Sequence, residues 1–356
     1  MKTILNEMNN IISVGILGGT GYGAGELLRI LSNHPNVEIV NVVSSSNAGE
    51  KISEFHKHLR GINDLYFDDK FKPESFVSKN RVLFSCLPHG TTTDFYAKIK
   101  DQLDSHNISF IDLSGDFRLK VKTVHEKFYP EAISSEEDRS QFIYGLPELH
   151  REEIPSYRKI ANPGCLSSSA ILALAPLSKE NFEGSIVIDA KTGTSGGGRG
   201  LNANFHHATR HASISAYKIL EHRHEPEILQ ELGDPSGERI KTIFVPHLLP
   251  VSRGILVTAY CTLDKEVSTE DLQRRYQEFF KGSPFIRIIK DSPELYNVIG
   301  SNFVDIFVQS RGNQVVVIAA LDNLVKGMAG TAIQNMNLIF GLNETTGLLY
   351  PSFGPI

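Results

Sequence analysis

A cluster of glycines between two apolar runs most constrains how the N-terminal part of this chain folds. Residues Ile11 to Leu17 form a short β-rich run, followed by GGTGYGAG, the helix-compatible stretch GELLRILSNH and a second apolar run, VEIVNVVS. This order predicts a β-α-β unit. Gly18 and Gly21 fall at the first turn, and Ala24 takes the third place of a fingerprint that accepts glycine or alanine there. Any turn can use glycine, but the position between strand and helix predicts a loop whose amides bind a pyrophosphate.

The remaining apolar runs divide the chain into two parts. RVLFSCLP and ISFIDLSG, separated by helix-like DFYAKIKDQL, continue the alternation expected of a parallel sheet covered by helices. After a soft boundary near Ala161 the β-rich segments GSIVIDAKTGTSG, ERIKTIFVPHLLPVSRGILVTAYCTL and NQVVVIAAL are longer and are interrupted by STEDLQRRYQEFFKG. They predict a second α+β domain with a partly antiparallel, mixed sheet. DNLVKGMAGTAIQNMNLIFG has helical spacing and predicts one long helix that packs back on the first domain.

Composition narrows the class of function. With 356 residues, of which 40% are hydrophobic and 22% charged, the chain is long enough for two packed domains. A formal net charge of -5 provides no basic field for nucleic acid, which favours a small-molecule substrate. No apolar stretch approaches the roughly 18 residues of a membrane span, and the polar start MKTILNEMNN lacks the layout of a signal peptide. We therefore expect a cytoplasmic enzyme with neither a nucleic-acid nor a membrane partner.

One of the three cysteines differs from the other two. Cys86, Cys165 and Cys261 are far apart and lack metal-ligand spacing, so we expect neither a disulfide nor a metal site. Cys86 and Cys261 lie in apolar runs and are interpreted as inert buried thiols. Cys165 ends the motif NPGC and opens the helix-compatible stretch LSSSAILALAPL. A thiol at a helix start can have its pKa lowered from about 8.5 to between about 3.5 and 7.5. The alternative is a small apolar residue in a helix cap.

A histidine pair provides a partner for this thiol. His222 and His224 lie in HRHEPEI, just before Pro226, which is typical of a helix start. Cysteine, histidine and a nicotinamide in one chain imply thioester chemistry. The pattern does not choose between the two histidines, and it leaves His206 and His207 ambiguous.

The end of the second strand bears on which dinucleotide binds. An acidic residue there would bind a ribose 2′-hydroxyl and repel a 2′-phosphate. This chain has Ser44, Ser45 and Ser46 there instead, which favours NADP as the cofactor. The alternative interpretation is an ordinary serine-rich turn. Lys51 could add positive charge to the site.

A second glycine-rich segment, GTSGGGRG, contains Gly196 and Gly197 and is either a connector or a lid over bound cofactor. Arg118 in DLSGDFRL and Arg199 are candidate anchors for a substrate phosphate or carboxylate, because guanidinium forms paired hydrogen bonds with such groups. A surface salt bridge is the alternative for either arginine.

Taken together, the motifs resemble those of the N-acetyl-gamma-glutamyl-phosphate reductases, relatives of the aspartate-semialdehyde dehydrogenases. The resemblance runs nearly the full length. Its motifs, in order, are GGTGYGAGELLRIL, HKHLRG, LPHG, IDLSGDFRL, YGLPEL, NPGC, GTSGGGRG, HRHEPEI, PHLLPVSRGIL, and NFVDI with DNLVKGMAGTAIQNMNL. It implies a Rossmann-type dinucleotide-binding domain of residues 1–163 with 327–356, an α+β catalytic and oligomerisation domain of residues 164–326, and a homo-oligomer, either a dimer or a tetramer.

The same resemblance assigns roles to residues. Cys165 would be the nucleophile, and His222 or His224 the general acid/base. Gly18, Thr20, Gly21 and Tyr22 would hold the pyrophosphate, Pro88 in LPHG and Gly196 and Gly197 would contact the cofactor, and Asn323 would lie near the nicotinamide. Asn162, Arg118 and Arg199 would bind substrate.

Two departures from the family pattern stand out. Leu166 and Ser167 follow NPGC where the family usually has an aromatic residue and then proline or alanine, and Ser45 stands where an arginine is common.

The function expected from these features is NADPH-dependent reduction of N-acetyl-L-glutamyl 5-phosphate through a cysteine thioester, in arginine biosynthesis. A histidine would protonate the developing oxyanion, and helix-start amides would stabilise it. Two alternatives stay open. One is the same chemistry on N-succinyl-glutamyl, aminoadipyl or aspartyl phosphate, and the other is a non-catalytic NADP-sensing regulator, which would need neither Cys165 nor the histidine pair.

Overall fold

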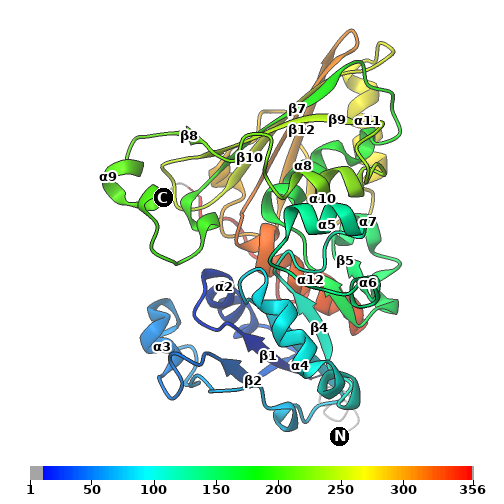
Figure 1. Cartoon of the computed structure of the whole chain (residues 1–356). Coiled ribbons are helices and arrows are strands. Elements are labelled where there is room, and N and C mark those ends of the chain that lie inside the picture. Colours follow the sequence, from blue (N-terminus) through cyan, green and yellow to red (C-terminus); the bar gives the residue numbers. More distant parts are fainter. Residues whose placement is uncertain (1–10, 355–356) are drawn as a thin grey trace, which may run out of the picture. The chain divides into compact units, whose positions relative to one another are not determined.

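In the computed structural model, which describes residues 11–354, the alternating runs of the N-terminal half form a six-stranded parallel sheet (Figure 1). Its strand order is β2-β1-β3-β4-β6-β5. Strand β1, between β2 and β3, is buried along its whole length, as expected for a strand covered on both faces. The strands are β1 (Ile12–Leu17), β2 (Val37–Val43), β3 (Asn80–Ser85), β4 (Ser109–Asp112), β5 (Phe142–Tyr144) and β6 (Lys159–Ala161).

The longer β segments of the second half form a seven-stranded mixed sheet, ordered β11-β12-β13-β10-β7-β9-β8. The pairs β7–β9 and β11–β12 are parallel, and the other neighbours are antiparallel. The mixed sheet predicted from the sequence is therefore confirmed. Its strands are β7 (Ser185–Thr192), β8 (Ser215–Ala216), β9 (Lys241–Leu248), β10 (Ile255–Thr262), β11 (Ile286–Ile288), β12 (Val304–Arg311) and β13 (Gln314–Leu321).

Helices connect and cover these sheets. The α-helices are α2 (Tyr22–Leu31), α3 (Ile52–Phe55), α4 (Thr91–Ser105), α5 (Lys122–Phe128), α6 (Glu136–Ser140), α7 (Pro147–His150), α8 (Cys165–Leu174), α9 (His207–Arg210), α10 (Glu225–Glu231), α11 (Thr269–Phe279) and α12 (Gly330–Ile339). Short 3₁₀ turns are η1 (Lys57–Leu59), η2 (Pro73–Ser75), η3 (Ile154–Ser156), η4 (Ala175–Leu177), η5 (Thr194–Gly197), η6 (Ala203–Phe205) and η7 (Leu295–Asn297).

The described residues separate into two compact units. Within the described residues, the first runs from residue 11 to Pro163 and takes in Ala329–Leu348, and the second comprises Gly164–Met328 and residues 349–354. The resemblance implies a first domain that includes all of 327–356, whereas residues 327–328 and the segment after Leu348 group with the second unit. The polar start MKTILNEMNN lies outside the described residues.

The C-terminal helical stretch is not the single long helix predicted for residues 322–341. A tight turn at Asp322 is followed by a π-helical turn, η8 (Val325–Ala329), and only then by α12. The Asp322 carboxylate accepts the N–H groups of Leu324 and Val325, and its carbonyl accepts the N–H of Gly327. The first N–H groups of a helix have no acceptor within it, so the carboxylate caps the start of this helical stretch. The bond from Gly327 to the carbonyl of Asp322 spans five residues, which is the spacing of a π-helix. Helix α12 packs against α2 and α7 in the first unit.

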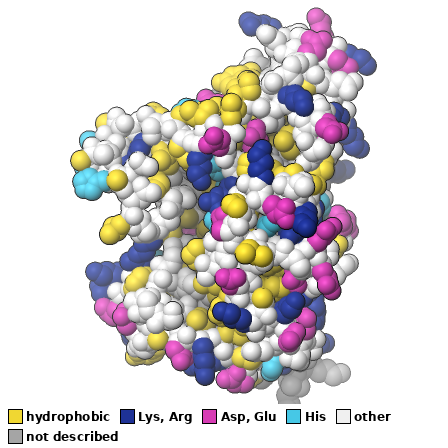
Figure 2. Space-filling view, in the orientation of Figure 1, with side chains coloured by type: hydrophobic (Ala, Val, Ile, Leu, Met, Phe, Trp, Pro, Cys, Tyr) yellow, Lys and Arg dark blue, Asp and Glu magenta, His cyan; other side chains and the backbone are white. Residues whose placement is uncertain are grey.

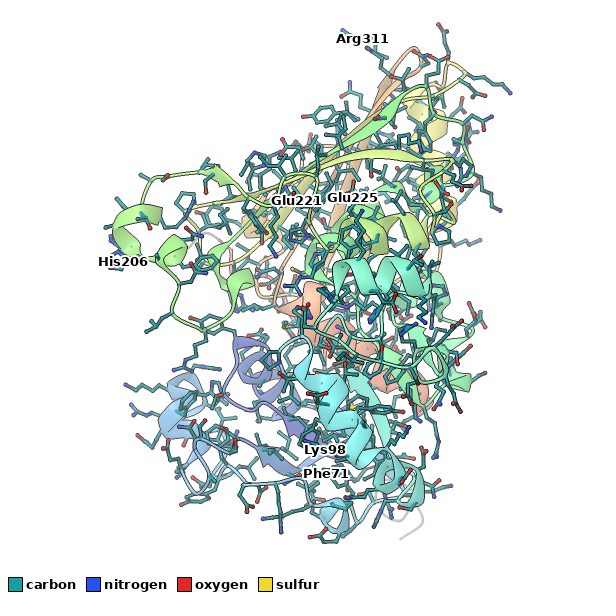
Figure 3. The ribbon with its side chains drawn as sticks, viewed as in Figure 1. Phe71, Lys98, His206, Glu221, Glu225 and Arg311 are labelled. Carbon is teal, nitrogen blue, oxygen red and sulfur yellow. The ribbon has the colours of Figure 1, made fainter. Side chains whose placement is uncertain are left out.

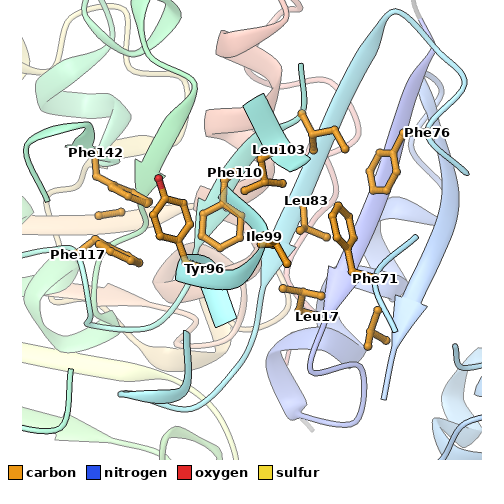
Figure 4. Packing of buried hydrophobic residues seen from close by; sticks show 13 residues of the cluster. Leu17, Phe71, Phe76, Leu83, Tyr96, Ile99, Leu103, Phe110, Phe117 and Phe142 are labelled. Carbon is orange, nitrogen blue, oxygen red and sulfur yellow. The ribbon is translucent and has the colours of Figure 1, made fainter. Parts of the chain in front are cut away.

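Aromatic residues fill the core on one face of the parallel sheet (Figure 4). The rings of Phe117 and Phe142 stack with centroids 4.0 Å apart, and Tyr96 of α4 packs edge-on against both. Tyr96, Ile99 and Leu103 follow helical spacing, so one face of α4 covers the sheet.

The second unit has a different core. Helix α8 contacts β7, β10 and β13, while α10 packs on α8. Every residue of α8 from Leu166 to Leu174 is buried, including three serines, and the hydroxyls of Ser167 and Ser168 are satisfied by bonds to the carbonyl of Gly164.

On the face drawn in Figure 2, basic and acidic side chains are interspersed. None of the helices within residues 11–354 is both long enough and apolar enough to cross a bilayer.

Gly115, in the loop after β4, tests the packing of the first unit. A Cβ there would lie 2.1 Å from the ring of Tyr129, which is fully buried. We expect Gly115→Ala to lower the free energy of unfolding by about 1–3 kcal/mol, because the ring has no room to move. Denaturant unfolding followed by circular dichroism measures this. Gly200→Ala, where a Cβ meets nothing within 4 Å, should stay within about 0.5 kcal/mol of the parent. An equal loss in both variants would contradict the steric explanation.

Candidate active site

The glycine turn after β1 is built by close backbone contacts. Gly18 has a φ of +71°, and a Cβ there would lie 2.8 Å from the carbonyl oxygen of Cys86, just beyond β3. Helix α2 begins after Gly21 with no side-chain cap and no acidic residue in its first turn. The ends of β1 and β3 flank the point where the strand order reverses, which is where α/β sheets bind ligands. Thr20 is half-buried and Tyr22 is exposed at this turn, so the cradle fits an anionic pyrophosphate.

The serine turn after β2 is closed on itself. Ser44 is buried, and Ser46 is exposed and donates its hydroxyl to Asn47 Oδ1 at 2.9 Å. Lys51 forms an ion pair with Asp64, with 2.5 Å between Nζ and Oδ1. Pro88 lies exposed on the segment after β3.

Arg118 and Asn162 are both buried at the end of β6. Arg118 donates from Nε to the carbonyl of Asn162 at 2.7 Å and from Nη2 to the carbonyl of Leu113 at 2.9 Å. Asn162 donates its N–H to the carbonyl of Asp112, and its side-chain oxygen accepts from Asn335 of α12. These contacts fix the main chain that enters NPGC, which is a different role from the substrate anchor expected of Arg118.

Cys165 is the first residue of α8, so the predicted helix start is confirmed. Its thiol is partly exposed, and the first turn of the ten-residue helix contains no acidic side chain. The free N–H groups and positive dipole end of such a helix favour a thiolate. A Cβ on Gly327 would lie 2.7 Å from the Cβ of Cys165, so the backbone of η8 passes close beside the nucleophile.

His224 lies directly against the residue before Cys165. A Cβ on Gly164 would be only 2.4 Å from His224 Nε2, so the imidazole occupies the space that a side chain would need. His224 Nε2 also lies 4.0 Å from Oε1 of Glu227, one turn further along α10. Glu227 is fully buried, and its Oε2 accepts the N–H of Gly164 at 3.1 Å and the hydroxyl of Ser167 at 2.8 Å. One carboxylate therefore joins the start of α8 to the imidazole.

His222 occupies a different environment from His224. Its ring is buried among Tyr217, His224 and Phe244, and its Nδ1 accepts the backbone N–H of His224 at 3.1 Å. Burial lowers the pKa of His222 to about 3, with the positive charges of Lys218 and Arg223 as lesser causes. His222 is therefore neutral at physiological pH and supports the main chain of its neighbour.

The predicted site residue Asn323 joins two loops of the second unit. Its Oδ1 accepts the N–H of Gly254 at 2.8 Å, and its Nδ2 donates to the hydroxyl of Ser195 at 2.9 Å. Next to it, the buried carboxylate of Asp322 pairs with Arg253 Nε at 3.2 Å.

The start of GTSGGGRG is anchored and its end is exposed. The N–H groups of Gly193, Thr194 and Ser195 each donate to a carbonyl of residues 251–254. Gly196, Gly197 and Arg199 are exposed. The anchoring at residues 193–195 limits any movement to the part of the segment that follows.

Several residues beside the site were missed from the sequence. Glu227 stands three residues after His224 in a predicted helix, so helical spacing could have indicated it. Tyr217 had no such signal. Its ring packs against His222, and burial, followed by the charge of Cys165, raises its pKa. Glu221 and Glu225, labelled in Figure 3, bracket the histidine pair, and Glu225 accepts the hydroxyl of Thr242 on β9.

The remaining histidines and cysteines have other surroundings. His206 caps α9 by accepting the N–H of Ala208 (Figure 3). Cys261 is buried, which raises its pKa to about 12, whereas Cys86 is only partly buried. Within residues 11–354 no group of three histidine, cysteine, aspartate or glutamate side chains is placed to hold a metal ion.

Two family models match the chain. Residues 13–157 match the "Semialdehyde dehydrogenase, NAD binding domain" and residues 165–323 the "Semialdehyde dehydrogenase, dimerisation domain". Solved structures share the fold. An aspartate semialdehyde dehydrogenase from Candida albicans with NADP aligns over 93% of this chain and 98% of its own, with a TM-score of 0.68 and 17% identity. Aspartate semialdehyde dehydrogenase II from Vibrio cholerae aligns over 92% and 98%, with a TM-score of 0.66 and 16% identity. The fold and the paired domains define a semialdehyde dehydrogenase with a nicotinamide-dinucleotide-binding domain.

Curated relatives narrow this class. An N-acetyl-gamma-glutamyl-phosphate reductase from Pelotomaculum thermopropionicum is 42% identical over 97% of this chain and 99% of its own length. A reductase of the same name from Methanococcus maripaludis is 43% identical over 94% of this chain and 97% of its own length. The chain belongs to the N-acetyl-gamma-glutamyl-phosphate reductase family, and the resemblance of its motifs is thereby confirmed.

The contact between Gly164 and His224 can be tested by adding one methyl group. In Gly164→Ala the imidazole must move away from the start of α8, so we expect kcat to fall by about 100-fold or more. Steady-state assays of aldehyde-dependent dinucleotide reduction measure it. Ser169→Ala, a small change at a buried position of the same helix, should keep parental kcat. Parental kcat in Gly164→Ala would contradict the placement of His224.

The depressed pKa of His222 predicts how stability depends on pH. The folded pKa is about 3 and the ordinary value is 6.5, so between these values the unfolded chain binds a proton that the folded chain does not. The contribution of the neutral imidazole to the free energy of unfolding is complete above pH 6.5. It is lost as the pH falls towards 3, at about 1.4 kcal/mol per pH unit. His222→Gln should therefore show a shallower loss of unfolding free energy between pH 6 and 4.5 in denaturant titrations. The exposed His207→Gln should retain the parental slope, and equal slopes in all three proteins would contradict the assignment.

Proposed function

We propose that this chain reduces N-acetyl-L-glutamyl 5-phosphate to N-acetyl-L-glutamate 5-semialdehyde and phosphate, with NADPH as the reductant, in arginine biosynthesis. The observation that carries the proposal is the placement of Cys165 at the start of α8, with the imidazole of His224 against Gly164. The curated relatives that align with nearly the whole chain are named for this activity.

The first step belongs to the thiolate of Cys165. Its sulfur attacks the acyl-phosphate carbon, the bond from that carbon to the phosphate oxygen breaks, and phosphate leaves with the electron pair. A thioester to Cys165 forms. Amides at the start of α8 are suited to stabilise the oxyanion of this step, because they have no acceptor within the helix.

His224 is the better candidate for the acid/base, and His222 for a positioning residue. His224 can protonate the oxyanion that develops on reduction of the thioester, and it recovers the proton when the aldehyde departs and the thiolate returns. Glu227, 4.0 Å away, favours the charged imidazolium in the interval. His222 remains neutral and holds the backbone of His224.

The dinucleotide, when bound, supplies the hydride. Gly18, Thr20, Gly21 and Tyr22 are proposed to hold its pyrophosphate on the first unit. Ser44 and Ser46 would bind a ribose 2′-phosphate, because no carboxylate occupies the end of β2 to repel it. We further assign Pro88, Gly196, Gly197 and Asn323 to the cofactor.

Substrate binding is proposed for Arg199 and Asn162, with Arg118 supporting the carbonyl of Asn162. The exposed guanidinium of Arg199 can pair with a phosphate or carboxylate. The distal acyl group is the less constrained part of the substrate, since the reacting end alone contacts Cys165.

We further propose that the protein is a homo-oligomer in the cytoplasm. Residues 1–163 with 327–356 would bind the cofactor, and residues 164–326 would carry out catalysis and form the contacts between subunits. Helix α8 covers one face of the second sheet. On the other face Ile243 and Tyr260 are 39% and 45% exposed, which supports a partner there.

The test is NADPH formation from N-acetyl-L-glutamate 5-semialdehyde, NADP and phosphate, followed by absorbance, in the parent and in Cys165→Ala. We expect turnover in the parent and a loss of at least about 1,000-fold in the variant, since without the sulfur no thioester forms. Parallel assays with NAD measure the preference for the 2′-phosphate.

The N-succinyl and aminoadipate semialdehydes serve as substrate controls. If the protein turns over one of these aldehydes but not the N-acetyl compound, the mechanism is supported and the substrate assignment is wrong. Equal rates in the parent and Cys165→Ala would refute the thioester route, and NADP binding without turnover of any aldehyde would favour a regulator.

A further inference from the structure

We propose that His56 is a positioning residue for the dinucleotide, because it holds the carbonyl of Gly19 and so directs the amide of Thr20 toward the pyrophosphate. His56 belongs to HKHLRG, a motif to which the proposed function gives no role. The inference rests on dinucleotide binding by the glycine turn, and it concerns the first unit alone.

His56 lies under the turn as a buried donor. It is 4% exposed and follows α3, outside the strand and the helix that the turn connects. Its Nε2 lies 2.7 Å from the carbonyl oxygen of Gly19. A carbonyl can only accept, so Nε2 carries the proton and donates. His58 lies 3.4 Å from the carbonyl of Gly25, so a second imidazole of the same motif faces the first turn of α2.

The bond to Gly19 fixes the next amide through the geometry of the peptide unit. In a trans peptide the C=O of one residue and the N–H of the next point in opposite directions. The Gly19–Thr20 peptide therefore directs the N–H of Thr20 away from His56. A donor fixed in this way costs no reordering when an anion binds, which strengthens the contact.

Packing around Gly19 holds this peptide in a single orientation. A Cβ on Gly19 would lie 2.8 Å from Val42 Cγ1 and 2.9 Å from the ring of Phe67. The N–H of Gly19 also donates to the carbonyl of Val43 at 2.9 Å. The residue is thus enclosed on its side-chain and amide sides, and the imidazole of His56 determines the direction of its carbonyl.

The adjoining helix leaves space for the imidazole. A Cβ on Gly25 of α2 would lie 2.8 Å from His56 Nδ1 and 2.9 Å from Cε1, so only glycine allows the ring to reach Gly19. Gly25 follows the fingerprint positions Gly18, Gly21 and Ala24, and its requirement comes from His56. This provides two independent ways to break the same bond.

The experiment measures the dissociation constant for NADPH by protein-bound fluorescence in the parent, His56→Leu, Gly25→Ala and His56→Gln. We expect binding about 10- to 100-fold weaker in His56→Leu, which has no donor, and weaker binding in Gly25→Ala, which displaces the ring but retains it. Gly25→Ala also replaces glycine by a better helix former, which offsets part of the free energy lost by displacing the ring. His56→Gln, whose amide can donate, should recover part of the affinity. At saturating dinucleotide, kcat should stay within about twofold of the parent.

His125→Leu is the matched control. His125 of α5 is a buried imidazole, 1% exposed, that lies 2.9 Å from the carbonyl of Ala132, and its loss should lower the melting temperature without changing the dissociation constant. Parental affinity in both His56→Leu and Gly25→Ala, or an equal loss of affinity in His125→Leu, would overturn the positioning role. Failure of the parent to bind NADPH would instead refute the proposed cofactor.

Discussion

The buried carboxylate of Glu227 is the interaction on which the geometry of the candidate active site depends. It accepts hydrogen bonds from the backbone of Gly164 and the hydroxyl of Ser167, and it lies beside the imidazole of His224. These contacts connect α10 to the first turn of α8, where Cys165 begins the helix. A buried charge is retained only when its partners satisfy it, so the carboxylate and the helix start require one another.

The second constraint is the close approach of glycine backbone to neighbouring groups, and it recurs at the glycine turn after β1 and around Cys165. Gly18 passes the carbonyl of Cys86 beside the dinucleotide turn, Gly164 admits the ring of His224, and Gly327 lies against Cys165. At each place a side chain would displace a functional group or its support. The glycines in these motifs are therefore required for steric reasons at the glycine turn and around Cys165, in addition to the conformational needs of turns.

Much of the fold followed from local pattern. The apolar runs around Val14 and Val82 identified buried parallel strands, and NPGC before a helix-compatible stretch identified the start of α8. Residues 322–341 do not form one regular α-helix, because the N–H of Gly327 bonds to the carbonyl of Asp322, five residues back, which gives the first turn π-helical spacing. Hydrophobic spacing does not report which backbone carbonyl each N–H selects, so it does not distinguish a π-helical turn from an α-helical one.

The sequence by itself determined the two sheets, the nucleophile candidate Cys165 and the glycine turn, because these depend on periodicity and on residues adjacent in the chain. Only the tertiary structure distinguished His222 from His224, showed Arg118 bound to main-chain carbonyls, and revealed Glu227 and His56 as supports of their loops. The physical reason is that burial and hydrogen-bond partnership join residues distant in sequence. His56 and Gly19 lie 37 positions apart, and Glu227 and Gly164 lie 63 apart, so no local pattern relates them.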